Sequence, residues 1–132
     1  MEERTSFYIT LLYKDFLAYV EKTLKKMGLD YEQLPFILYV GKHPGCTTSE
    51  LRKETHLEWK HSKKSLSSLK TDGFIVNKGQ HLFLTMLGEE AYKTMHHVCY
   101  YWDQELQNVM EPEEWNQAKK ILKKLVLKRG EH

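Results

Sequence analysis

The middle of the chain carries two helix signals and a hairpin signal in quick succession, and this order constrains the fold more than any other feature. Residues 47–50, Thr-Thr-Ser-Glu, have the form of a capping box and predict a short helix to about Thr55. A second helix is predicted over residues 59–71, where Asp72-Gly73 ends it. Two helices joined by a tight turn, the second rich in lysine, are typical of a helix-turn-helix.

A short β-hairpin is predicted directly after these two helices. Phe74–Val76 and Leu82–Leu84 are apolar segments on either side of Gly79, which can adopt the positive φ that a tight turn needs. A hairpin in this position is a wing. An earlier helix, from about residues 31–33 to Val40, precedes both signals.

Long helices are predicted on both sides of this unit. Residues 5–28 and 86–129 carry apolar side chains at helical spacing, with a break at Glu111-Pro112, and the first helix is apolar on two faces. A chain of 132 residues buries only about two thirds of its unfolded surface, so we expect a second copy to cover these helices. The predicted fold class is mainly α with a short β-hairpin. It combines a winged helix-turn-helix (about residues 30–85) with N- and C-terminal dimerisation helices in one domain, residues 1–132.

The helix over residues 59–71 is predicted to contact DNA. At about 100° per residue, Ser65, Leu66 and Leu69 face inward with Ser62, while lysines and hydroxyls form the opposite stripe. Lysines suit phosphates, and hydroxyls suit phosphates or base edges. A lysine-rich face is often merely solvated, but its place between a capped helix and a hairpin favours double-stranded DNA. The predicted contacts are Thr47, Thr48, Ser49, Trp59, Lys60, His61, Lys63, Lys64, Ser67, Ser68 and Lys78.

Charge is unevenly distributed although the net charge is only +2. Residues 119–129 contain six basic residues and no acid, whereas residues 86–114 contain seven acids and Lys93 as the one base. The last helix alone would suit a membrane surface. Pairing with the acidic helix before it accounts for both charge blocks, so we prefer that interpretation.

Several strings resemble the MarR/SlyA family of winged-helix regulators over essentially the full chain. They are residues 33–40, 43–47, 49–51, 69–76 and 84–88, the last with the pattern Leu-Thr-x-x-Gly. The resemblance implies a homodimer joined by its first, fifth and sixth helices, with paired winged helices on a palindromic operator. It also implies a repressor role and release by a small aromatic or phenolic ligand.

The predicted wing departs from the family pattern. Family wings usually carry an Asp-x-Arg string, whereas residues 77–81 read Asn-Lys-Gly-Gln-His, without arginine or aspartate. Lys78 or His81 can reach a phosphate, but reading of a narrow minor groove by arginine is lost. We therefore expect weaker or less selective binding. The alternative is a dimeric protein-interaction module, an antirepressor or adaptor.

Three other groups of residues give weaker indications of function. His96 and Cys99 have a spacing that suits one metal ion, but zinc needs three or four ligands. Only the distant His43, Cys46 or His61 could complete the set, so we expect neither metal nor cofactor. Cys46 precedes a helix start, an environment that can lower a thiol pKa and suit a redox sensor. Aromatic residues such as Tyr13, Tyr39 and Tyr92 line either a ligand cavity or, more commonly, the core.

No motif in the sequence supports catalysis or membrane insertion. The chain lacks a glycine-rich phosphate loop, a metal triad and a nucleophile motif, so we do not expect an enzyme. Residues 1–4 do not resemble a signal peptide, and no apolar run approaches the roughly 20 residues that span a bilayer. With two cysteines far apart in sequence, we expect a cytoplasmic protein with reduced thiols.

Overall fold

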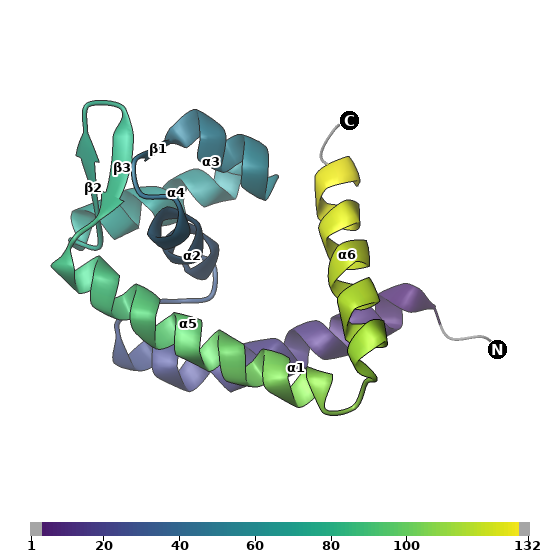
Figure 1. Ribbon diagram of the computed structural model, residues 1–132. Helices are drawn as coiled ribbons and strands as arrows, with labels where there is room; N and C mark the ends of the chain where they lie inside the picture. Colours follow the sequence, from purple (N-terminus) through teal and green to yellow (C-terminus); the bar gives the residue numbers. More distant parts are fainter. Residues whose placement is uncertain (1–3, 130–132) are drawn as a thin grey trace.

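A computed structural model describes residues 4–129; the acidic start of the sequence, residues 1–3, and residues 130–132 lie outside the described part. The elements, in chain order, are α1 (Thr5–Lys26), α2 (Leu34–Lys42), β1 (Cys46–Thr47), α3 (Thr48–Thr55), α4 (Trp59–Thr71), β2 (Ile75–Lys78), β3 (His81–Leu84), α5 (Met86–Gln107) and α6 (Pro112–Arg129). The predicted fold class, mainly α with a short hairpin, is confirmed (Figure 1).

The core lies in the lobe that α2, α3, α4 and the sheet form together (Figure 1). Phe36, Leu51 and Leu69 are fully buried there. Val20 of α1 and Met95 of α5 are also fully buried and belong to the same cluster. The lobe is therefore attached to the paired long helices α1 and α5 by continuous apolar contact.

The sheet has three antiparallel strands in the order β1-β3-β2. The predicted hairpin is present, with Val76 opposite Phe83 and Gly79 at φ +64° in the turn. Its strands reach closer to the turn than predicted, because Asn77, Lys78 and His81 also pair. The third strand, β1, was not predicted because two residues are too few to show a periodic pattern. It places Cys46 opposite Leu82, which joins the start of α3 to the wing.

The start of α2 differs from the prediction. The helix begins at Leu34, and residues 31–33 form a turn before it. Asp30 and Gln33 close this turn reciprocally: the Gln33 amide donates to the Asp30 carboxylate, and the Asp30 amide donates to the Gln33 side-chain oxygen, each at 3.0 Å. This reciprocal bond satisfies backbone donors ahead of the helix.

The two ends of the chain keep exposed apolar faces. α6 turns away from α5 after residue 111, so the basic and acidic helices do not run side by side within one chain (Figure 1). Lys119 of α6 nevertheless lies near Asp103 of α5, and both line one surface hollow. The side chains of Phe7, Tyr8, Ile9, Leu11, Leu12, Tyr13, Ile121, Leu122, Leu125 and Val126 are each 48–61% exposed. Residues 4–129 include no helix with the length and apolar character that a membrane crossing requires.

Candidate nucleic-acid interface

The start of α3 is fixed by the predicted capping box. The Glu50 amide donates to the Thr47 hydroxyl at 3.1 Å, and the Thr47 amide donates to the Glu50 carboxylate at 3.3 Å. The capping box is therefore confirmed. Thr47 and Thr48 are half-buried, whereas Ser49 is exposed. Of the three, Ser49 presents its side chain most freely to a partner.

The helix α4 presents the predicted faces. Ser65, Leu66 and Leu69 are buried. The predicted stripe opposite them, formed by Lys60, Lys64, Ser67 and Thr71, is exposed, and so is Lys63 beside it. Because none of these lysines has an acidic partner within the helix, their charge is available to an anion.

An acidic side chain that sequence reasoning missed caps α4. The Glu58 carboxylate accepts hydrogen bonds from the Lys60 amide at 2.8 Å and the His61 amide at 3.0 Å. The hydrogen bonds from the His61 and Lys60 amides lower the pKa of Glu58. An ionised carboxylate therefore stands beside the exposed His61 at the leading end of α4. Glutamate is not one of the usual N-cap residues, so the sequence carries only a weak signal for this cap.

Trp59 anchors α4 rather than projecting from it. The indole is half-buried against the core, and the Arg52 guanidinium carbon lies 4.5 Å from the ring centroid. This cation–π contact holds Arg52 beside the start of α4. Arg52 and Lys53 line a surface hollow together with Thr48 and Ser49. Neither base was predicted as a site residue, although both are exposed and lie on the predicted helix-turn-helix.

Ser68 is oriented differently from the lysines. The side chain is half-buried, its oxygen accepts a hydrogen bond from the Gln33 side-chain amide at 3.0 Å, and its proton is donated to the Ser65 carbonyl at 3.1 Å. A hydroxyl has a single proton to donate. Ser68 therefore cannot donate to a phosphate in this arrangement, and the structure does not bring it to the exposed stripe.

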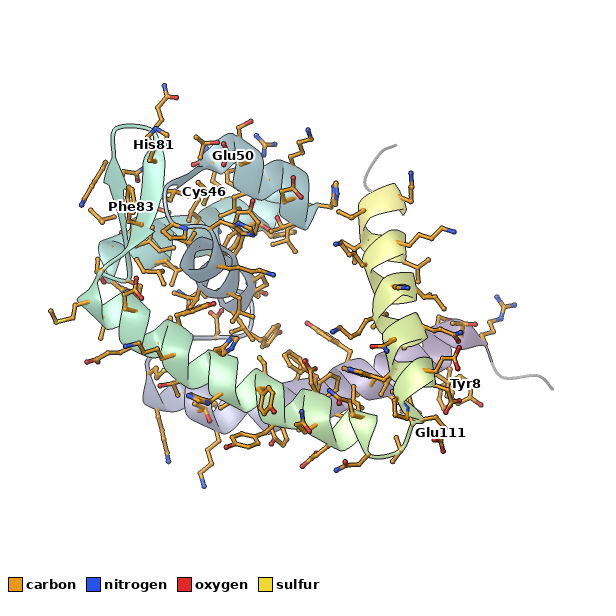
Figure 2. All side chains as sticks on the ribbon, viewed as in Figure 1. Tyr8, Cys46, Glu50, His81, Phe83 and Glu111 are labelled. Carbon is orange, nitrogen blue, oxygen red and sulfur yellow. The ribbon has the colours of Figure 1, made fainter. Side chains whose placement is uncertain are left out.

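The wing carries one exposed cation and one tethered histidine. The Lys78 amine lies 5.1 Å from the Phe83 ring centroid. The His81 Nδ1 atom lies 2.8 Å from the Gly45 carbonyl oxygen. Figure 2 shows His81 on the outer part of the hairpin, with Cys46 beneath it toward the interior of the lobe. Lys78 is therefore an exposed cation that lies over Phe83, and His81 ties the wing to the segment before α3.

Comparison with known proteins places the chain in a family. No family model matches it. The HTH-type transcriptional regulator BilQ of Clostridium symbiosum is 30% identical to this chain over an alignment 132 residues long. The alignment covers 95% of this chain and 92% of that protein. A MarR protein from Peptoclostridium difficile superposes with a TM-score of 0.85 at 16% identity, covering 99% of this chain and 90% of that one. The chain belongs to the MarR/SlyA family.

Membership of the MarR/SlyA family makes this chain a DNA-binding winged-helix transcriptional regulator. Its relatives are transcriptional regulators, which as a class are not enzymes. One solved structure of a MarR family protein includes bound DNA. The Rv2887 protein of Mycobacterium tuberculosis in complex with DNA superposes with a TM-score of 0.68 at 17% identity, covering 94% of this chain and 98% of that chain.

The cysteines of this MarR/SlyA chain do not have the environment of a sensor. Burial, followed by the Glu50 charge, raises the pKa of the Cys46 thiol, which contradicts the expectation that the helix start lowers it. Burial and then Asp103 raise the pKa of Cys99 to about 11. Within residues 4–129, no group of three or more histidine, cysteine, aspartate or glutamate side chains could hold a metal ion. His96 and Cys99 therefore have no third ligand among these residues.

We expect both thiols to react slowly in the native protein. A folded-state pKa above the ordinary value of 9.0 keeps Cys99 protonated at pH 8, and the thiolate is the reactive form. Alkylation by iodoacetamide at pH 8 should be at least about tenfold slower than in urea. The same shift predicts that the contribution of Cys99 to stability is present below pH 9 and is lost as the pH rises toward 11. Rapid labelling of the native protein at pH 8 would contradict this assignment.

A groove of about 330 Å³ separates α1 from the start of α4. Its lining residues are Tyr13, Tyr31, Glu32, Pro35, Leu57, Glu58, His61, Ser62 and Ser65. Of the aromatic residues considered from the sequence, Tyr13 lines the groove, while Tyr39 and Tyr92 pack against the core. A molecule bound there would touch both the long helix α1 and the first turns of α4.

Proposed function

We propose that this regulator is a homodimeric repressor that inserts α4 into the major groove of a palindromic operator. The exposed lysine and serine stripe of α4 carries the proposal, because it lies opposite a buried face and directly before the wing. Lysine ammonium groups bind phosphates, and serine hydroxyls bind phosphates or base edges. The DNA complex of Rv2887 supports this assignment.

The proposed contacts follow from exposure and chemistry. Lys60, Lys63 and Lys64 bind phosphates at the groove edges, and Ser67 faces the bases. Ser49 binds the backbone at the start of α3, and Arg52 adds a phosphate contact that its stacking on Trp59 pre-orients. The residues beside these contacts that complete the proposed DNA-binding surface are Thr47, Thr48, Trp59 and His61. Lys78 of the wing binds phosphates farther along the duplex.

We further propose that the apolar ends of the chain join two copies. Residues 5–28 and 86–129 form the dimerisation helices, and residues 30–85 form the DNA-binding part of one functional unit. The exposed apolar side chains near Leu12 of α1 and Leu125 of α6 support this division, because water-exposed patches of this kind mark interfaces. A two-fold axis sets the two α4 helices about 34 Å apart, one turn of B-DNA.

Charged substitutions in these faces should separate the subunits. Leu12→Asp combined with Leu125→Asp places two carboxylates in the proposed interface, where burial of an unpaired charge is costly. The double variant should run as a monomer in light scattering and should bind operator DNA much more weakly, because each half-site then binds alone. Met86→Asp combined with Leu87→Asp, at residues 84% and 48% exposed in the first turn of α5, adds the same charge away from the α1 and α6 faces and is the charge-matched control. A dimeric double variant would place the interface elsewhere.

A titration of duplex DNA at several salt concentrations tests the proposed function. The purified protein is first allowed to select duplexes from a random library, and the selected duplex is compared with a scrambled one. Affinity should fall steeply with salt, with a logarithmic slope of about −0.9 for each phosphate contact. No preference for any duplex, together with a flat salt response, would favour the protein-interaction module, which the arginine-free wing supports.

We also propose that a small aromatic acid in the groove between α1 and α4 releases the DNA. The groove includes Glu58 and His61 of the leading end of α4, so a bound molecule bears on the helix that contacts DNA. The complex of Rv2887 with p-aminosalicylic acid supports this ligand class. Titrating the protein–duplex complex with p-aminosalicylate checks it: unchanged duplex affinity at saturating ligand would contradict release.

A further inference from the structure

We propose that Gln33 is a positioning residue that sets the rotation of α4 for DNA recognition. Gln33 lies in the turn between α1 and α2, and its side chain is only 5% exposed. The side-chain amide donates a hydrogen bond to the Ser68 hydroxyl of α4 at 3.0 Å, across 35 residues of sequence. This inference rests on the proposed function and concerns a residue outside the DNA-facing stripe.

The Gln33 amide has a fixed orientation. Its oxygen accepts from the Asp30 backbone amide at 3.0 Å, and the Asp30 carboxylate accepts in turn from the Gln33 backbone amide. With the oxygen occupied by Asp30, the nitrogen must point to Ser68. Ser68 passes its own proton to the Ser65 carbonyl at 3.1 Å. A continuous chain of hydrogen bonds therefore runs from the α1–α2 connection to the backbone of α4.

This chain of hydrogen bonds fixes the rotation of α4 about its own axis, which apolar contacts alone do not fix. Leu66 and Leu69 hold α4 against the core, but apolar contact is non-directional and tolerates small rotations of a helix. A hydrogen bond has a preferred direction, and a buried donor that loses its partner is costly. Ser68 directly follows Ser67 and lies one helical turn after Lys64, so the bond at Ser68 fixes the direction of the DNA-facing stripe.

Two variants remove the bond from opposite sides. Ser68→Ala deletes one hydroxyl from α4, and Gln33→Met keeps the length of the side chain but removes both polar atoms. Ser62→Ala is the matched control, because Ser62 is another half-buried serine on the inward side of α4. Affinity is measured for the selected duplex and the scrambled duplex, and urea unfolding is measured for every variant.

We expect each variant to lower the ratio of selected to scrambled affinity by about tenfold, while scrambled affinity and its salt slope stay at wild-type values. The double variant should lose no more than either single one, because both remove the same bond. If Gln33→Met does not fold, Ser68→Ala alone carries the test. An unchanged affinity ratio, whatever the loss in stability, overturns the inference while leaving the proposed function in place. A wild-type protein that selects no duplex overturns both.

Discussion

Replacing Lys60, Lys63 and Lys64 together by alanine should lower duplex affinity by at least about 100-fold at physiological salt and reduce the salt slope by roughly three. All three side chains are exposed on one side of α4, opposite the buried Ser65 and Leu66. Their loss removes the counterion release that drives phosphate binding. The fold should survive, because no buried atom changes.

The measurement needs a control of equal charge. Lys22, Lys26 and Lys93 are also exposed, lie on α1 and α5 and, replaced together by alanine, change the net charge by the same amount. Fluorescence anisotropy at several salt concentrations compares the two triple variants, and light scattering checks that both keep the molecular mass of the wild-type protein. Wild-type affinity in the α4 triple variant would mean that another element contacts DNA.

Gly88→Ala should destabilise the protein by about 3 kcal/mol. A Cβ atom at Gly88 would overlap the backbone carbonyl oxygen of Phe74, which cannot rotate away as a side chain can. The same carbonyl accepts a hydrogen bond from the Thr85 amide at 3.0 Å, and the Thr85 hydroxyl accepts from the Gly88 amide at 3.0 Å. The close approach of Gly88 to the Phe74 carbonyl joins the start of α5 to the wing. This contact gives a physical reason for the threonine and the glycine of the Leu-Thr-x-x-Gly pattern.

Urea unfolding at fixed protein concentration measures this effect, because the apparent stability of the proposed dimer would depend on concentration. Glu90→Ala is the control: Glu90 is exposed on the same helix, and its replacement should change the free energy of unfolding by less than about 0.5 kcal/mol. An unfolding midpoint unchanged by Gly88→Ala would mean that α5 begins farther from Phe74.

Local signals predicted most of the secondary structure and the orientation of α4. The capping box at Thr47, the lysine stripe of α4 and the turn at Gly79 each depend on neighbours within a few residues. Interactions of this kind are decided by side-chain chemistry and helical or strand periodicity alone. For the same reason, the inward position of Ser65, Leu66 and Leu69 could be predicted without coordinates.

Contacts between distant segments could not be predicted in this way. The pairing of β1 with β3, the Gln33–Ser68 bond and the stacking of Arg52 on Trp59 depend on where whole helices and strands lie. Burial of Cys46 reversed the expected direction of its pKa shift, because desolvation depends on the surrounding core.

The amino-acid order by itself therefore determined the helices, the hairpin and the cationic side of α4, since each follows from interactions a few residues long. Which of the predicted site residues are exposed depends instead on how the separate helices and strands pack together. Ser68 is the clearest case: its position on α4 follows from the sequence, but its hydroxyl is engaged by an amide 35 residues away. Such a partner is supplied by the packing of separate elements, and no local pattern encodes it.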